Sequence, residues 1–219
     1  MGKIFRIAID GPSGAGKSTI AKRLALELAI DYLDTGAMYR AVAYKMMSEG
    51  ISVDEVDKIK SLLESTHIDF SKGETILDGE IISDKIRTPE ISELASDVSA
   101  LPVVREKLVK LQREMGKRKS VVMDGRDIGT NVFPDAEFKF FLTASVKERA
   151  RRRWNQLKEM GKEIDITQVE ADIIKRDHND STRKINPLQK AKDAVELDST
   201  TLSIKEVTDF ILNIVRPSL

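Results

Sequence analysis

The sequence contains no cysteine and only two histidines among its 219 residues. Disulfides, thiolate metal sites and cysteine nucleophiles are therefore excluded, and a zinc centre is not expected. Lys and Arg together number 36, and so do Asp and Glu, so no overall electric field attracts the chain to nucleic acid or to an anionic membrane. We expect no nucleic-acid partner and no membrane partner, and any site for an anion must be local.

Long hydrophobic runs are missing as well. The apolar stretch at residues 4–9 is interrupted by Arg6 and is too short for a signal peptide or a membrane span. With 41% hydrophobic residues the chain can still bury a sizeable core, and its length fits one globular unit that carries insertions. We therefore expect a cytoplasmic protein.

The order of apolar segments indicates an α/β fold. Four short segments are predicted as buried strands, at residues 4–9, 121–123, 138–142 and 194–197. The helical segments between them are long enough for crossover connections, which predicts a parallel β-sheet flanked by helices. A predicted hairpin with its turn at Asp78-Gly79 interrupts this alternation of strands and helices, so we expect a small antiparallel β insertion there.

A glycine-rich segment with the Walker A pattern follows the first predicted strand and precedes a helix. Its glycines let backbone N–H groups converge on phosphate oxygens, and the helix N-terminus adds partial positive charge. Lys17 is expected to reach the β- and γ-phosphates, and Ser18 can ligate Mg²⁺. The expected ATP-binding residues are Gly11, Pro12, Ser13, Gly14, Ala15, Gly16, Lys17, Ser18 and Thr19.

A second motif closes the strand at residues 121–123. Asp124 ends this apolar strand as in a Walker B element, and we expect it to hold Mg²⁺ through water; a structural turn is the alternative. Arg126 and Asp127 follow at the carboxyl end of the strand, where ligands bind in open parallel sheets. Arg126 is thus a phosphate-clamp candidate, with a surface ion pair to Asp127 as the alternative.

Two further arginine groups have open interpretations. Arg40 lies one helical turn after Gly36 and could face an anion, or it could simply extend along the surface above a Thr35 cap. Arg176, Asp180 and Arg183 have spacing i, i+4 and i+7, so they can share one helix face, although a plain ladder of ion pairs looks the same.

Residues 146–184 are strongly polar, with eleven Lys or Arg against eight Asp or Glu. A solvated helical hairpin and a mobile lid over phosphates both fit this composition. If the segment is a lid, removing its arginines should lower turnover more than it weakens acceptor binding.

Taken together, the motifs resemble the cytidylate kinase family from Ile7 to about Ser203. The matching segments are GPSGAGKS at 11–18, DTGAMYRA at 34–41, IRTPEIS at 86–92, DGRDIGT at 124–130, RDHNDSTR at 176–183 and DAVELDST at 193–200. The resemblance implies the P-loop nucleoside triphosphate hydrolase fold, with a core at 1–35, 109–145 and 185–219. It also implies an inserted nucleoside-monophosphate-binding domain at 36–108 and a helical lid at 146–184.

The resemblance also implies roles for individual residues. The catalytic set is Lys17, Asp124, Arg126 and Arg183, and Ser18 with Asp124 would hold the metal. The acceptor phosphate would be held by Thr35, Arg40, Arg126 and Arg183. The cytosine would be read by Ser96, Arg105 and Asp127, and the sugar by Arg176 and Asp180. One of the lid residues Arg149, Arg151, Arg152 and Arg153 would reach the transferring phosphoryl group.

The implied activity is a Mg²⁺-dependent transfer of the γ-phosphoryl group of ATP to CMP or dCMP by a monomer, in pyrimidine nucleotide metabolism. One alternative is a P-loop kinase for another small acceptor, such as UMP, AMP or a shikimate-like molecule. Another is a GTPase-like switch, but the sequence has no Asn-Lys-x-Asp guanine signature. An arginine cluster on the acceptor side would have no purpose in such a switch.

Overall fold

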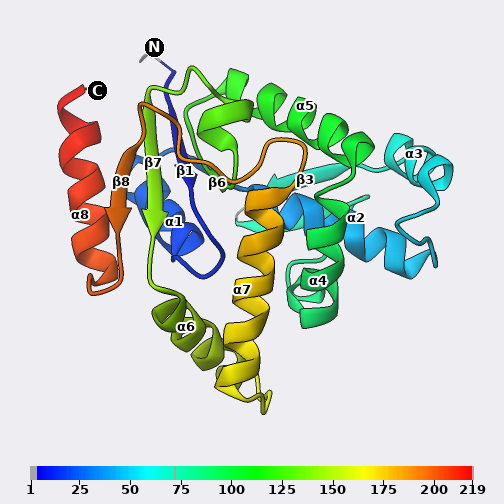
Figure 1. The fold of residues 1–219 in the computed structure, drawn as a ribbon. Helices are drawn as coiled ribbons and strands as arrows, with labels where there is room; N and C mark the ends of the chain where they lie inside the picture. The colour runs from blue at the N-terminus through cyan, green and yellow to red at the C-terminus, as the bar shows by residue number, and fades with distance from the viewer. Residues whose placement is uncertain (1–3, 72, 219) are drawn as a thin grey trace. The chain divides into compact units, whose positions relative to one another are not determined.

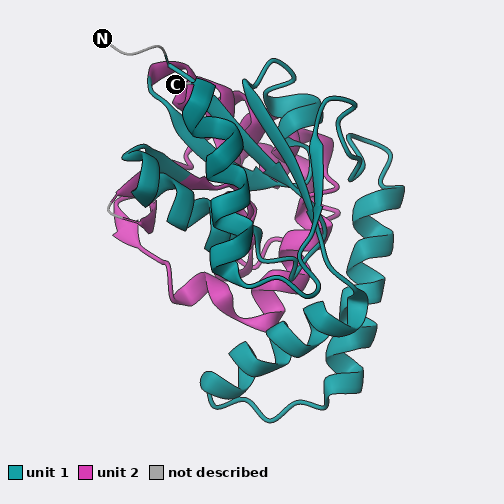
Figure 2. Cartoon of the chain, turned by 90° about the vertical axis from the view of Figure 1, so that its left-hand side faces the viewer, with its two compact units in different colours: residues 1–32, 119–219 teal, residues 33–118 magenta. Residues whose placement is uncertain are grey.

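A computed structural model describes residues 4–71 and 73–218 of the chain. The chain divides into two compact units, coloured separately in Figure 2. Unit 1 comprises residues 1–32 and 119–219, and unit 2 comprises residues 33–118. The Walker A and Walker B segments of the sequence lie in unit 1, whereas the segments 34–41 and 86–92 and the predicted hairpin lie in unit 2.

The centre of unit 1 is a five-stranded sheet with the order β2-β6-β1-β7-β8. Its strands are β1 (Arg6–Asp10), β2 (Asp31–Asp34), β6 (Val121–Gly125), β7 (Phe138–Thr143) and β8 (Val195–Asp198), and the last two residues of β2 belong to unit 2. β1 runs parallel to both β6 and β7, and β7 runs parallel to β8. The predicted parallel sheet is thereby confirmed, and it brings the ends of β1 and β6 together.

Helices α1 (Lys17–Leu28) and α8 (Ile204–Val215) pack against each other and against this sheet (Figure 1). The apolar side chains of α1, such as Ile20 and Leu24, meet Ile211 of α8 in one buried cluster. α8 begins with a complete capping box between Ser203 and Glu206. This packing fixes the start of α1, where the glycine loop ends.

Helices α6 (Val146–Glu159) and α7 (Ile166–Thr182) form a hairpin within unit 1, visible in Figure 1. A small apolar cluster of its own, with Ala150, Leu157 and Ile173, holds the two helices together. α7 ends before Arg183, whose ψ of 141° is extended. Arg176 and Asp180 therefore lie on the helix, but Arg183 is not on its face as the spacing predicted.

Unit 2 combines four helices with a three-stranded antiparallel sheet. The helices are α2 (Thr35–Ser48), α3 (Val56–Glu64), α4 (Pro89–Val98) and α5 (Pro102–Arg118), and the strands are β3 (Ile68–Ser71), β4 (Glu74–Leu77) and β5 (Glu80–Ile81). The turn between β4 and β5 has positive φ at both Asp78 and Gly79, as a type I′ turn requires. The predicted hairpin is therefore confirmed.

Three short helical turns complete the assignment: η1 (Lys85–Arg87), η2 (Ile128–Val132) and η3 (Arg216–Ser218). η2 is a π-helix turn, a rare form that is often found at functional sites. Within the described part of the chain, no helix has the length and apolar character that crossing a membrane requires.

Candidate functional site

The glycine loop of residues 11–16 connects the end of β1 to the start of α1. A Cβ atom at Gly11, where φ is 146°, would overlap the carbonyl oxygen of Leu142, so only glycine allows this close approach. Gly16 is in the left-handed region with φ of 93° and places Lys17 at the first position of α1. The exposed N–H groups of the loop and helix start are the donors that phosphate oxygens need.

Lys17 is almost entirely buried beneath this loop. Its Nζ donates a hydrogen bond of 2.8 Å to the carbonyl oxygen of Pro12. Burial, together with the nearby charge of Arg126, lowers the pKa of Lys17 to about 7. A phosphate group at this place would favour the charged ammonium and so raise that pKa again.

Asp124, near the end of β6, contacts the start of α1. Its Oδ2 accepts a 2.8 Å hydrogen bond from Ser18, and its Oδ1 accepts one of 2.8 Å from the hydroxyl of Tyr32. The structure thus brings together Ser18 and Asp124, the two predicted metal residues. Within residues 4–71 and 73–218 no group of three or more His, Cys, Asp or Glu side chains could hold a metal alone.

This donor set nevertheless fits Mg²⁺. The ion prefers hard oxygen ligands and usually keeps several waters while it binds one or two protein oxygens and the substrate phosphates. The Ser18 hydroxyl and the Asp124 carboxylate are such oxygens, and they lie next to the phosphate-binding loop. A nucleotide would have to supply the remaining ligands.

Two buried arginine–aspartate pairs lie in unit 1. Nε of Arg126 contacts Oδ2 of Asp180 at 2.6 Å, and Nη2 of Arg183 contacts Oδ1 of Asp127 at 3.1 Å. Burial tends to raise the pKa of Asp180, but the charges of Arg126, Arg176 and Arg183 outweigh it and lower the pKa. Arg126 thus pairs with Asp180 and not, as one alternative had it, with Asp127 at the surface.

Together these side chains form a charged cluster in a largely buried environment. Its basic members are Lys17, Arg126, Arg176 and Arg183, and its acidic members are Asp10, Asp124, Asp127 and Asp180. The cluster has four acids and four bases, so its formal charges cancel when all eight groups are ionised. The arginine forks are planar and can exchange a carboxylate for a phosphate of similar geometry.

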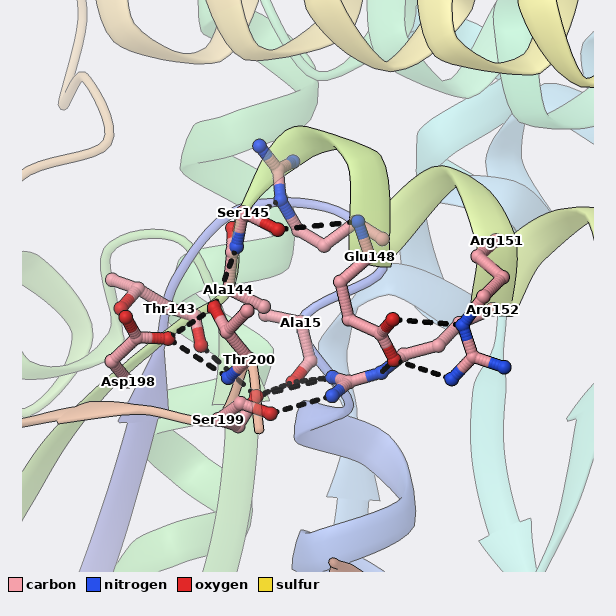
Figure 3. Close-up of polar contacts among 11 residues, drawn as sticks. Ala15, Thr143, Ala144, Ser145, Glu148, Arg151, Arg152, Asp198, Ser199 and Thr200 are labelled. Atoms are coloured by element: carbon pink, nitrogen blue, oxygen red, sulfur yellow. Dashed lines mark hydrogen bonds and ion pairs between the residues drawn. The ribbon is translucent and has the colours of Figure 1, made fainter. Parts of the chain in front are cut away.

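The start of α6 contacts the glycine loop through two arginines. Arg149 donates to the carbonyl oxygen of Ser13 at 3.0 Å and pairs with Asp177 at 2.7 Å. Arg152 donates to the carbonyl oxygen of Ala15 at 3.4 Å and to the carbonyl oxygen of Ser199 at 2.6 Å, as Figure 3 shows. Both arginines therefore hold the outer, carbonyl side of the loop.

The other two arginines that were predicted for the lid, Arg151 and Arg153, are placed differently on α6. Arg151 is exposed and pairs with Glu148 at 2.7 Å, and Glu148 also accepts from Arg152 (Figure 3). The hydrogen bond from Arg151 is the main cause that lowers the pKa of Glu148 to about 2. Glu148 therefore does not complete a capping box at Ser145, although Ser145 accepts from its backbone N–H at 3.2 Å. Arg153 lies one position further along the same helix.

In unit 2, Arg40 folds back over the first turn of α2. Its Nη2 contacts Asp34 at 3.0 Å, and Asp34 also caps the helix by accepting from the N–H of Ala37. The Nε of Arg40 is buried and has no hydrogen-bond partner in the described chain. A donor at a helix N-terminus that lacks an acceptor suits an anion. Thr35 is buried at the first position of the same helix.

The predicted base-reading residues of unit 2 lie on α4 and at the start of α5. Arg105 is buried, and its Nη1 donates to the Tyr39 hydroxyl at 3.3 Å and to the carbonyl oxygen of Ser99 at 3.3 Å. Ser96 is half-buried on α4, three residues before Ser99. These contacts hold Arg105 against α2 and the end of α4.

Comparison with known proteins resolves the family. A family model described as cytidylate kinase matches residues 7–217. The chain belongs to the cytidylate kinase family. The resemblance read from the six sequence motifs is therefore confirmed, including its extent over nearly the whole chain.

Curated members of the cytidylate kinase family are similar along their full length. The cytidylate kinase of Caldicellulosiruptor saccharolyticus is 51% identical over 216 residues, which cover 97% of this chain and 96% of that protein. The cytidylate kinase of Desulfitobacterium hafniense is 48% identical over 217 residues, covering 98% and 94% respectively. Among solved structures, a shikimate kinase from Bacteroides thetaiotaomicron superimposes with a TM-score of 0.51 at 13% identity, over 98% of this chain and 99% of that one. This last similarity concerns the fold alone and agrees with the predicted P-loop fold.

Several residues at the site were not predicted from the sequence. They are the partners of predicted residues, namely Tyr32, Asp34, Tyr39, Asp177 and Ser199. Asp34, Tyr39 and Ser199 lie inside segments that resemble the cytidylate kinase motifs, and Asp177 lies beside Arg176 in another. Their membership in a motif was a signal, but the sequence did not indicate which arginine or hydroxyl each one contacts.

Proposed function

We propose that this protein is an ATP-dependent nucleoside monophosphate kinase that transfers the γ-phosphoryl group of ATP to CMP or dCMP, giving ADP and CDP or dCDP. The observation that carries the proposal is the charged cluster at the carboxyl ends of β1 and β6. There the Lys17 ammonium of the glycine loop lies close to the buried Arg126–Asp180 pair. Membership in the cytidylate kinase family supports CMP as the acceptor.

Residues of the glycine loop would bind the donor. The N–H groups of residues 13–18 would bind the phosphates, while the carbonyl oxygens of Ser13 and Ala15 accept hydrogen bonds from Arg149 and Arg152. Lys17 would neutralise charge on the β- and γ-phosphates. Mg²⁺, held by Ser18 and Asp124 with water, would supply further neutralisation of the triphosphate.

The acceptor needs no general base. The second pKa of a phosphate monoester is about 6, so at neutral pH the acceptor oxygen is already an anionic nucleophile. Both histidines are consistent with this, since His67 and His178 are exposed and His178 lies outside the charged cluster. Catalysis is then a matter of position and charge, in which Arg126 and Arg183 exchange their carboxylate partners for phosphate oxygens.

Further parts of the proposal concern the remaining predicted residues. In unit 2, Thr35 and Arg40 would bind the acceptor phosphate, and Ser96 and Arg105 would contribute to pyrimidine recognition along with Asp127. Arg176 and Asp180 would contact the sugar. The hairpin of α6 and α7 would act as the lid, with one of its arginines reaching the transferring group. We also propose a cytoplasmic monomer, because the donor is ATP and no apolar interface stripe is evident in the sequence.

A coupled ADP-release assay with purified protein tests the proposal. CMP, dCMP, UMP, AMP, GMP and shikimate are offered with ATP and Mg²⁺, and reactions without acceptor or with excess EDTA serve as controls. We expect turnover concentrated on CMP and dCMP and lost with EDTA. Turnover only on another acceptor would keep the P-loop kinase and overturn the base assignment. ADP release that is independent of any acceptor would overturn the kinase itself.

A further inference from the structure

Asp10, the last residue of β1, lies at the edge of the site and makes side-chain hydrogen bonds that have no role in the proposed function. Its side chain is buried, with 4% of the residue exposed. Its two carboxylate oxygens accept separate backbone hydrogen bonds, from the N–H of Ile128 at 2.8 Å and from the N–H of Gly129 at 2.7 Å. These are the first two residues of the π-helix turn η2, whose N–H groups have no partner within the turn.

The residues just before η2 belong to the acceptor side of the site. Asp127 is the N-cap residue of η2 and pairs with Arg183, and its Oδ2 accepts from Asn131 at 2.9 Å. Arg126, one residue earlier, pairs with Asp180. A carboxylate that fixes the start of η2 therefore fixes the backbone that carries Arg126 and Asp127.

Asp10 is well placed to serve as a rigid anchor. β1 is the central strand of the sheet, and Asp10 is in register with Gly125 of β6 and with Phe141 of β7. The next residue is Gly11, so the same strand end also begins the phosphate-binding loop. One residue thus connects the loop for the donor phosphates to the segment that carries the acceptor arginine.

Simple packing does not explain a carboxylate at this position. Burying a charged group is costly, and burial raises the pKa of Asp10 to about 6 in spite of its two hydrogen bonds. An asparagine of the same size would place its NH2 donor against one of the two N–H groups. Gly129 adds a steric constraint, because a Cβ there would lie 3.4 Å from Oδ2 of Asp10 and 3.3 Å from Cδ of Lys139.

From these contacts we infer that Asp10 is a positioning residue for the acceptor, which holds Arg126 and Asp127 in place through the backbone of Ile128 and Gly129. The inference rests on the proposed function, because it names the substrate whose binding depends on this geometry. Both carboxylate oxygens of Asp10 accept these backbone N–H groups, so its effect on the acceptor would pass through the backbone. Its loss should therefore affect CMP much more than ATP, whose loop has its own bonds such as that from Lys17 to Pro12.

The test compares Asp10→Asn with a matched control, Glu137→Gln. Glu137 also accepts a backbone N–H of β1, that of Arg6 at 2.8 Å, but at the opposite end of the strand. Loss of a hydrogen bond to a charged group changes binding by about tenfold or more. We expect Asp10→Asn to raise the KM for CMP by at least about tenfold while the KM for ATP stays within about twofold, and Glu137→Gln to leave both within about twofold.

Hydrogen–deuterium exchange of the backbone amides gives a second measurement, which does not depend on enzyme turnover. In Asp10→Asn the amides of Ile128 and Gly129 should exchange faster than in the parent protein, while the amides of α1 should not. If Asp10→Asn does not fold, Gly129→Ala probes the same contact from the other side and should raise the KM for CMP selectively.

The outcomes separate the inference from the function. Parent protein that does not phosphorylate CMP would overturn the proposed function. Parent protein that does so, with equal rises in both KM values or with none in the folded variant, would overturn the positioning role of Asp10. A lower melting temperature with unchanged KM values would assign Asp10 to stability alone and overturn it as well.

Discussion

At the scale of single residues, the site is built from charged groups that are buried and paired before any substrate arrives. Arg126 pairs with Asp180 and Arg183 with Asp127, and Lys17 lies close to both Asp124 and Asp10. Buried charges without partners are costly, so each arginine needs a carboxylate in the absence of phosphate. These ion pairs keep the guanidinium groups of the arginines oriented. A phosphate can then replace a carboxylate without a large rearrangement of the arginine side chains.

The lowered pKa of Lys17 predicts that ATP binding takes up a proton. At pH 8 most of the Lys17 side chain is neutral in the free protein, because its pKa is about 7. The triphosphate favours the ammonium form and moves the pKa back toward its ordinary value of about 10.4. Uptake therefore increases as the pH rises through about 7 and fades as the pH falls below it, and the affinity for ATP should fall as the pH rises from 7 toward 10.

Calorimetry in buffers of different ionisation enthalpy measures this uptake. We expect close to one proton per ATP at pH 8, and none for Lys17→Met. The neighbouring charges that act on Lys17 are Arg126, Asp124, Asp180 and Asp10, so Asp124→Asn should lower the pKa of Lys17 further and leave the uptake in place. Binding without buffer dependence at pH 8 would contradict the assignment.

At the scale of elements, the hairpin of α6 and α7 is joined to the glycine loop through its first turn. Arg149 is buried and connects three segments, since it donates to Ala144 and Ser13 and pairs with Asp177 of α7. Arg152 adds Ala15 and Ser199, the residue that follows β8. The first turn of α6 is therefore fixed to the glycine loop. At the far end of the hairpin, Gly161 has a left-handed backbone, and no atom lies within 4 Å of the position that its Cβ would take.

Arg149 and Arg151 form a matched pair for mutation, because they lie two residues apart on α6 but differ in burial. Arg149→Ala removes several hydrogen bonds to charged or buried groups and should lower the free energy of unfolding by about 2 to 3 kcal/mol. Arg151→Ala removes an exposed ion pair with Glu148 that water screens, so it should leave the free energy of unfolding nearly unchanged. Urea unfolding measures both values.

The same two variants also show whether the contacts of Arg149 affect turnover. Arg149→Ala should also lower kcat, because the carbonyl of Ser13 loses the contact that orients the loop. Equal effects of both variants on stability and on kcat would show that the contacts of Arg149 with the loop are unimportant.

At the scale of the whole molecule, the chain has no net charge and divides into two compact units. Unit 1 contains the parallel sheet, the glycine loop and the α6–α7 hairpin, and unit 2 contains the antiparallel sheet with Arg40 and Arg105. A ligand that binds only the folded state stabilises the unit to which it binds. Lys17, the proposed donor residue, lies in unit 1, whereas Arg40, one of the proposed acceptor residues, lies in unit 2.

ATP should raise the melting temperature of the parent protein. At a concentration of 100 times its Kd, a ligand stabilises by about 2.7 kcal/mol, which corresponds to about 5 to 11 °C for a protein of this size. Lys17→Met should lose most of this shift, while Arg40→Ala, in unit 2, should keep it. Differential scanning calorimetry with a nonhydrolysable ATP analogue measures the shift, and its full retention in Lys17→Met would contradict the role of Lys17.

The sequence alone determined the class of fold, the family and the order of the main elements. A glycine loop between a strand and a helix has a fixed spacing, apolar strands are continuous in sequence, and the Asp78-Gly79 turn is local, so each could be predicted from neighbouring residues. The face shared by Arg176 and Arg183 was predicted less well, because the end of α7 at Thr182 depends on contacts beyond the helix.

Only the tertiary structure decided which charged groups meet. Arg126 and Asp180 are 54 positions apart, and Asp10 is 118 positions from Ile128, so no local pattern could pair them. Their contacts depend on the packing of whole strands and helices, which brings the ends of β1 and β6 to one edge of the sheet. Sequence motifs named most residues of the candidate site, and the fold decided the partner of each one, because hydrogen bonds and ion pairs require distances of a few ångströms that only packing sets.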